Sequence, residues 1–151
     1  MSRIKTLLVS VALMAGGESQ VSAGASDLAI VVNSANPVAS LNKSQLSALY
    51  KGKTTAFPNG SSASAINLPT DSSLRQDFDK AVLNMTPDEA KRFWIDMKIR
   101  SGASAPPKMP SPAAVARHVA STSDAIGYVP VADAKGLKIV ARVVGGNVTG
   151  P

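Results

Sequence analysis

Unbroken apolar runs near both ends of the chain predict buried β-strands. Leu28–Val32 is entirely apolar and largely β-branched, and polar residues bound it on either side. Residues 125–129 and 137–143 have a similar character, while residues 63–68 form a weaker candidate. Runs without polar alternation are typical of strands that are fully buried. We therefore expect these strands to form the centre of the fold.

Polar capping signals between these strands predict where the helices begin. In a capping box, the N-cap side chain accepts from the backbone three residues on, and that residue's side chain reaches back. Three pairs fit this pattern: Asn42 with Gln45, Ser73 with Gln76, and Thr86 with Glu89. A fourth helix is expected to start at Ser111 and Pro112, and Gly52 and Gly102 are expected to end the first and third helices.

Apolar residues within these helices recur at three- and four-residue intervals, as expected of helices with one buried face. The predicted buried positions are Leu46, Leu49, Tyr50, Leu74, Phe78, Ala81, Val82, Phe93, Trp94, Met97, Val115 and Val119. Residues 144–151 carry no comparable pattern, and we expect them to be frayed. Because strands alternate with helices, the sequence predicts an α/β fold with a mostly parallel or mixed sheet flanked by helices.

The first 23 residues predict a secretory signal peptide. Arg3 and Lys5 form a basic start, residues 6–17 form an apolar core, and Val21-Ser-Ala23 is a small-residue cleavage pattern. The apolar core is too short to cross a bilayer, so we expect no stable membrane insertion after cleavage. The predicted mature protein, residues 24–151 with a core at 27–143, has the length of one domain. A secreted chain without cysteine must rely on its core, which favours a bacterial periplasm.

The residues that usually carry catalysis or metal binding are scarce. The chain has no cysteine and a single histidine, His118, which lies within a predicted helix. This set does not supply the ligands of a typical zinc site, and Ser72 and Ser73 lack the Gly-x-Ser-x-Gly pattern of a nucleophile elbow. The formal net charge is +6, but a basic stretch such as residues 91–108 is usually a solvated face, and few aromatics are available to stack on bases. We therefore expect no enzyme activity, no cofactor, no metal and no nucleic-acid partner.

The polar turn at residues 70–73 is the strongest candidate for binding. It joins a predicted strand to a predicted helix, and a helix start presents free N–H groups and the positive end of the helix dipole. The side chains beside these groups are Asp71, Ser72, Ser73 and Arg75. Together they predict an oxyanion site. Capping by Ser73 explains the same turn without a ligand, and Arg75 alternatively pairs with Asp71 or Asp79; the sequence leaves these explanations open.

Three segments, taken in order, carry a family resemblance. The first runs from Ala29-Ile-Val-Val-Asn33 through Asn36-Pro37 to the Tyr50-Lys-Gly-Lys53 element; the second is the Thr70-Asp-Ser-Ser73 turn; the third is Asp124-Ala-Ile-Gly-Tyr-Val129. They resemble the periplasmic phosphate-binding proteins of ABC transporters, the PstS-like group, over residues 27–143. The resemblance implies one lobe of a periplasmic-binding-protein type II-like fold. It also implies recognition of phosphate or a related inorganic oxyanion, without catalysis, in ABC-type phosphate uptake or sensing.

The resemblance extends to individual residues, with departures. In that group a serine and neighbouring N–H groups at this helix start hold phosphate, and Asp71 and Ser73 resemble the matching Asp and Ser. Pro69 stands where an arginine is usual, and Leu74 with Arg75 replaces a small Gly-Thr pair. We expect Arg75 to restore the lost positive charge from another direction. Further candidate ligands after the first strand are Asn33, Ser34 and Ser40.

The resemblance also bears on partners. Two-lobed members close on their ligand, whereas the motifs here come from one lobe, so we expect weak binding, or binding completed by a partner or a second copy. The implied partners are an ABC transporter permease or a membrane sensor. The alternative function is an interaction module that kept the fold, lost the ligand and docks on such a sensor or transporter.

Overall fold

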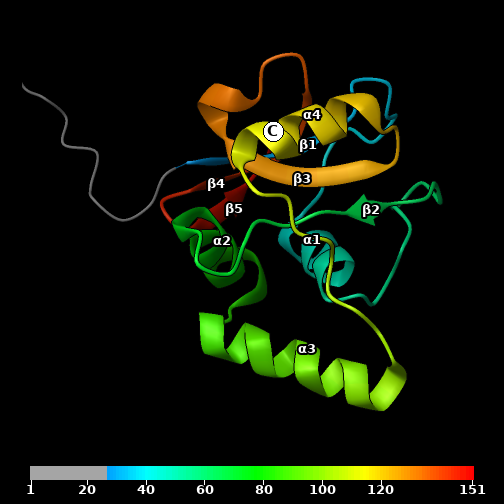
Figure 1. Ribbon diagram of the computed structural model, residues 1–151. Helices are drawn as coiled ribbons and strands as arrows, with labels where there is room; N and C mark the ends of the chain where they lie inside the picture. Colours follow the sequence, from blue (N-terminus) through cyan, green and yellow to red (C-terminus); the bar gives the residue numbers. More distant parts are fainter. Residues whose placement is uncertain (1–26) are drawn as a thin grey trace, which may run out of the picture.

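The computed structural model describes residues 27–151, and the predicted signal peptide lies outside the described residues. The elements, in order, are β1 (Leu28–Val32), α1 (Lys43–Tyr50), β2 (Ser64–Ala65), α2 (Ser73–Phe78), the π-helical turn η1 (Asp79–Leu83), α3 (Pro87–Ser101), α4 (Pro112–Ser121), β3 (Ala125–Pro130), the 3-10 turn η2 (Val131–Asp133), β4 (Lys138–Val144) and β5 (Asn147–Thr149). Strands and helices are interleaved, as Figure 1 shows. Over this part of the chain, no helix combines the length and the apolar character that a bilayer crossing requires.

The strands form one mixed sheet in the order β2-β3-β1-β4-β5. The central strand β1 runs antiparallel to both neighbours, whereas β2 is parallel to β3. In the β1–β3 register, Val32 lies opposite Ile126 and Leu28 lies opposite Pro130. The end of β1 therefore lies beside the starts of β2 and β3. As a result, the loops that follow β1 and β2 emerge at opposite ends of the sheet.

Helices cover both faces of the sheet. In Figure 1, α4 lies over one face, and α1 and α2 lie against the other. Gly127 belongs to the first face, because a Cβ there would lie 2.6 Å from Cγ1 of Val115 in α4. Tyr128 belongs to the second face, and its ring stacks on Phe78 of α2 with centroids 4.0 Å apart. All five residues of β1 are buried between these layers, which confirms the prediction of a buried strand.

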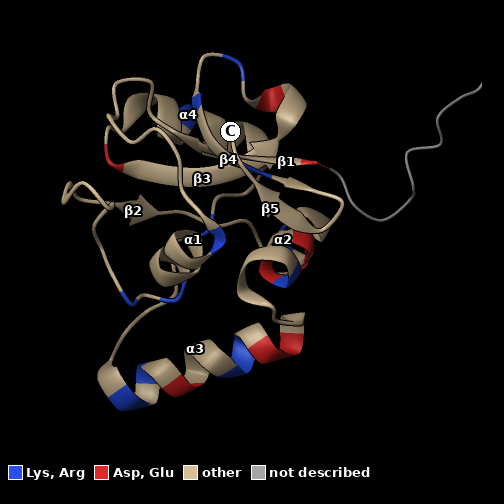
Figure 2. Cartoon of the chain, turned by 180° about the vertical axis from the view of Figure 1, so that it is seen from behind, with Lys and Arg blue, Asp and Glu red and all other residues tan. Residues whose placement is uncertain are grey.

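Helix α3 lies apart from the sheet, beyond α1 and α2 (Figures 1 and 2). Its ends confirm the prediction, since Thr86 forms the expected capping box with Glu89 and Gly102 ends the helix with a φ of 70°. Its predicted buried face is wrong, because Ala90 is the buried residue of this helix. The three residues predicted to be buried are only half-buried: Phe93, Trp94 and Met97. Figure 2 shows charges of both signs along the helix, as expected of a segment that is largely solvated.

The end of the chain is ordered, which corrects the expectation of frayed residues at 144–151. β4 and β5 form an antiparallel hairpin in which Val144 lies opposite Asn147. The intervening Gly145 and Gly146 have φ values of 57° and 79°. A two-residue turn with both residues in the left-handed region matches the twist of the flanking strands, and glycine adopts it without strain. The Gly-Gly pair is therefore the signal that the sequence interpretation overlooked.

Candidate functional site

The polar turn at residues 70–73 follows residues 66–68, whose backbone is hydrogen-bonded to neighbouring segments on both sides. β2 is shorter than predicted, yet the N–H of Ile66 still donates to β3 at 2.9 Å. Asn67 pairs with the loop that precedes α4, and Leu68 is buried. The chain then reverses, and the N–H of Ser72 donates to the carbonyl of Pro69 at 3.0 Å. The turn thus starts from a fixed position at the edge of the core.

The start of α2 has no side-chain cap. Ser72 is the N-cap residue and its side chain makes no capping hydrogen bond, so the predicted box between Ser73 and Gln76 is wrong. Within residues 27–151, the other three α-helices are capped by the side chains of Asn42, Thr86 and Ser111. The hydroxyl residues at the start of α2 are half-buried (Ser72) and exposed (Ser73). The first N–H groups of α2 are therefore left without a side-chain acceptor, an arrangement that an anion would complete.

Arg75 lies beneath this turn. The residue is 4% exposed, and its Nε lies 3.4 Å from Oδ2 of Asp79, one helical turn further on. Its Nη1 donates to the carbonyl of Leu68 at 3.1 Å. Of the explanations that the sequence left open, the structure bears out pairing with Asp79. The guanidinium ties the strand end to the helix, and direct contact between Arg75 and a ligand stays a prediction.

Only one of the two carboxylate oxygens of Asp79 has a hydrogen-bond partner among the described side chains. The residue is 3% exposed, and its Oδ1 has no hydrogen-bond partner among the described residues. Burial raises the pKa of Asp79 above its ordinary value of 3.8, while the charge and hydrogen bond of Arg75 oppose that rise. A buried carboxylate depends strongly on its partners, because few other groups replace the lost hydration. The ion pair therefore makes the start of α2 sensitive to any change at Arg75.

Tyr128 connects the two sequence motifs physically. Its hydroxyl donates to Oδ1 of Asn67 and accepts from the N–H of Leu68 at 3.4 Å. The N–H of Leu68 also donates to Oδ1 of Asn67 at 2.9 Å, so Asn67 and Tyr128 together hold this N–H while Arg75 holds the carbonyl. Burial raises the pKa of the Tyr128 phenol far above its ordinary value, so the hydroxyl stays a neutral hydrogen-bonding group. The Ile-Gly-Tyr-Val strand thus supports the residue from which the turn departs.

Three of the predicted site residues lie elsewhere. Asn33 is buried, and its Nδ2 donates to the carbonyls of Val119 at 2.9 Å and Ala120 at 3.1 Å, at the end of α4. Ser34 is exposed next to it, and Ser40 is exposed beside β4. Asn33 follows the end of β1, which lies beside the start of β2, whereas the turn lies beyond Leu68, four residues after Ser64. At about 3.3 Å per residue of strand, this separates the two along the sheet by roughly 13 Å. The structure therefore groups Asp71, Ser72, Ser73 and Arg75, with Asp71 exposed, and it does not bring Asn33, Ser34 and Ser40 to them.

A cavity of about 510 Å³, here called the turn cavity, opens beside the turn. Thr70 and Arg75 contribute to one wall, and Trp94 of α3 contributes to the opposite wall. Most of the remaining lining is apolar, with the exposed side chains of Lys91, Lys98 and Lys108 among it. Trp94 faces this opening together with the exposed Ile95 and Ile99, whereas Phe93 and Met97 do not line it.

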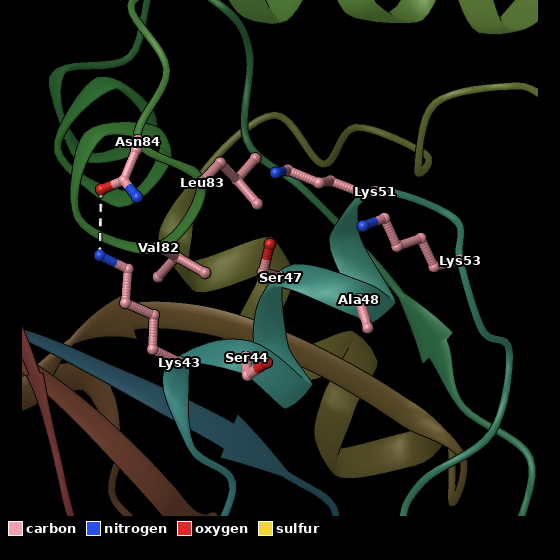
Figure 3. Close-up of a pocket in the computed structure, with 9 residues that line it drawn as sticks. All are labelled: Lys43, Ser44, Ser47, Ala48, Lys51, Lys53, Val82, Leu83 and Asn84. Carbon is pink, nitrogen blue, oxygen red and sulfur yellow. Dashed lines mark hydrogen bonds between the residues drawn. The ribbon is translucent and has the colours of Figure 1, made fainter.

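Sequence reasoning missed a second cavity, of about 460 Å³, between α1 and the end of η1 (Figure 3). This lysine cavity is lined by Lys43, Ser44, Ser47, Ala48, Lys51, Lys53, Val82, Leu83 and Asn84. A signal was present, because Lys43, Ser47 and Lys51 recur every four residues and so share one helix face. The opposite wall comes from η1, some thirty residues further along the chain, and no local spacing reveals it.

Solved structures with a similar fold include three receptors or related proteins of phosphate transport. The chain aligns with an ABC-type phosphate transport receptor from Vibrio cholerae at a TM-score of 0.57 and 21% identity. It aligns with PstS from Borrelia burgdorferi at 0.59 and 17%, and with a structure from Clostridium perfringens that contains bound phosphate at 0.57 and 18%. Each alignment covers 76% of this chain, but only 46%, 47% and 45% of those chains in turn. The chain thus spans a little under half of their length, and at these identities the likeness shows the fold. No curated protein matches the chain by sequence.

The structure and these neighbours define the class: a mixed α/β lobe of the kind found in solute-binding proteins. The model of the PBP superfamily domain matches residues 11–150. The chain belongs to the PBP superfamily. This confirms the family resemblance and the predicted fold class, and a single lobe fits the partial coverage of these longer chains.

Proposed function

We propose that this protein is a secreted, periplasmic solute-binding protein for phosphate or a related inorganic oxyanion, associated with ABC-type phosphate uptake or with a membrane sensor. The observation that carries the proposal is the uncapped start of α2, held in place by Arg75 and Tyr128 within a PBP fold. The phosphate-related neighbours support an oxyanion as the class of ligand.

In the proposed site, both backbone and side-chain groups contact the anion. The first N–H groups of α2 and the hydroxyls of Ser72 and Ser73 donate to the anion. Asp71 cannot donate when ionised, but its carboxylate accepts from the protonated oxygen of hydrogen phosphate. Sulfate carries no such proton at neutral pH, so Asp71 favours phosphate. Arg75 contributes by holding the strand end and the helix together rather than by reaching into solvent.

Thermal melting with added phosphate or sulfate tests the proposal, because a ligand that binds only the folded state raises the melting temperature. We expect millimolar phosphate to raise it and sulfate to raise it less. The double substitution Ser72→Ala with Ser73→Ala should lower phosphate affinity by about tenfold or more, since a hydrogen bond to a charged group contributes about 1.5–3 kcal/mol. The matched control is Ser34→Ala with Ser40→Ala, which removes two hydroxyls away from the turn and should leave affinity unchanged. Absence of any shift with phosphate would refute the proposal.

The second candidate function is a docking module without a ligand. Ile95 and Ile99 of α3 are 52% and 79% exposed, next to the lysines of the turn cavity, and this combination favours a protein partner. A protein that shows no melting shift with oxyanions, and that still binds the cognate permease or sensor through α3, would support this alternative.

A further inference from the structure

We propose that the lysine cavity binds a small, multiply charged phosphate compound, such as pyrophosphate or a compact organic phosphate ester. This site is separate from the proposed oxyanion site at the start of α2, and it uses α1 and η1 instead. The inference rests on three features of the cavity: its charge, its free donors and its size.

The charge of the lysine cavity is one-sided. Lys43, Lys51 and Lys53 line it, and its lining contains no Asp or Glu. Two ion pairs occur within residues 27–151, and both are Arg–Asp pairs outside this cavity. Proximity to the end of a helix dipole accounts for Lys51, but Lys43 is the first residue of α1, where the dipole disfavours a cation. Three like charges around one opening repel one another, and a polyvalent anion relieves that repulsion.

Donors in the lysine cavity remain available. The ammonium of Lys43 reaches across to Asn84 and donates to Oδ1 at 3.0 Å, as Figure 3 shows, which leaves two further N–H groups. The hydroxyls of Ser44 and Ser47 take part in no hydrogen bond formed by the described side chains. Ser47 projects from the middle of α1 into the space between Lys43 and Lys51 (Figure 3). Ammonium and hydroxyl donors arranged around one opening suit the many acceptor oxygens of a phosphate compound.

The size of the lysine cavity selects among anions. A volume of about 460 Å³ falls within the range of small-molecule sites and exceeds what a single tetrahedral oxyanion fills. Ala48, Val82 and Leu83 supply an apolar part of the lining, which suits the carbon portion of an organic phosphate. Asn84 adopts a left-handed conformation with a φ of 54° at the end of η1, and this places its amide at the edge of the cavity.

Calorimetric titration with inorganic pyrophosphate, at constant ionic strength, tests the inference. We expect saturable binding, and we expect the triple substitution K43Q/K51Q/K53Q to weaken it at least about tenfold. The matched control is K91Q/K98Q/K108Q, which removes the same charge from the exposed lysines of the turn cavity and should change affinity less than about threefold.

The outcomes separate this site from the proposed oxyanion site. Ser72→Ala with Ser73→Ala should leave pyrophosphate binding at the lysine cavity intact, even if phosphate binding at the turn is absent. Should the triple variant fail to fold, the single variant Lys51→Gln, compared with Lys98→Gln, repeats the test. No binding of pyrophosphate to the unmodified protein, equal losses in both triple variants, or loss only in the serine variant would each overturn the inference.

Discussion

Replacing Arg75 with methionine should destabilise the protein far more than replacing the similar Arg100. Both arginines pair with an aspartate four positions away on one helix, at Nε–Oδ distances of 3.4 Å for Arg75 with Asp79 and 3.0 Å for Arg100 with Asp96. The difference is burial: the side chains of the first pair are 5% and 4% exposed, whereas those of the second are 75% and 51% exposed. The two pairs therefore compare an Arg–Asp contact across four positions in two environments, with the order of the two residues along the chain reversed.

The expected magnitude follows from what R75M leaves behind. Asp79 loses its counter-charge while its Oδ1 is already without a partner, and the carbonyl of Leu68 loses a donor. Removing one member of a buried pair costs about 3–5 kcal/mol of unfolding free energy, a large share of the roughly 5–15 kcal/mol that folded domains have. R100M should cost at most about 0.5 kcal/mol, because exposed helical pairs contribute little. The double variant R75M/D79L should be more stable than R75M alone, since no buried charge then remains.

The pH dependence adds a second check. The pKa of Asp79 is raised in the folded state, so the stability that its neutral form provides is fully present below the ordinary value of 3.8 and is lost as pH rises through the folded-state pKa. Without Arg75 that pKa rises further, so the cost of R75M should grow as pH rises above the ordinary value of 3.8. Urea unfolding followed by circular dichroism measures both effects. A cost for R75M within about 1 kcal/mol of that for R100M, or a double variant less stable than R75M, would refute the reasoning.

Other substitutions probe the supports of the turn. Gly127→Ala should destabilise by about 1–3 kcal/mol in urea unfolding, because its Cβ would lie 2.6 Å from Cγ1 of Val115, and Val115→Ala should partly restore the loss. Tyr128→Phe should cost about 0.5–1.5 kcal/mol, since it removes the hydroxyl that donates to Oδ1 of Asn67 while the N–H of Leu68 keeps that Oδ1 as an acceptor at 2.9 Å, and it should also lower the phosphate-induced melting shift. Thr86→Ala should cost about 1 kcal/mol, whereas Ser72→Ala should cost nearly nothing, because only Thr86 makes a side-chain cap. Equal losses at Thr86 and Ser72 would show that α2 is capped after all.

The fold was predictable wherever the signal was local. The buried strand Leu28–Val32 and the capping boxes at Asn42 and Thr86 depend on adjacent residues, and the structure confirms them. The hairpin at Gly145 and Gly146 was equally local and was overlooked. The burial of α3 was not predictable, because an apolar helix face looks the same whether it meets a sheet or an open cavity.

The candidate site was predictable in part for the same reason. The spacing of Arg75 and Asp79 showed that they could pair, but only the packing of α2 on the sheet decides that the pair is buried. The register of β1 on β3 explains why Asn33 does not join the turn, because register rather than distance in the sequence sets which loops meet. The lysine cavity required two segments far apart in sequence, so it became visible only in three dimensions.

The departures from the family pattern at Pro69 and Arg75 are related through Leu68, which precedes Pro69 and whose carbonyl accepts from Arg75. Pro69 stands where the resemblance predicts an arginine, and Arg75 is buried with its charge matched by Asp79. Its hydrogen bond to the carbonyl of Leu68, together with the bonds that Asn67 and Tyr128 accept from the N–H, fixes the strand end without a ligand. In the proposed site, an anion is held by backbone N–H groups and hydroxyls, while the guanidinium of Arg75 stays paired with Asp79 and with the carbonyl of Leu68. Such a site discriminates by the protonation and geometry of the oxyanion more than by its total charge. At constant ionic strength, the affinities for phosphate and sulfate should therefore differ by more than non-specific attraction to an anion would produce.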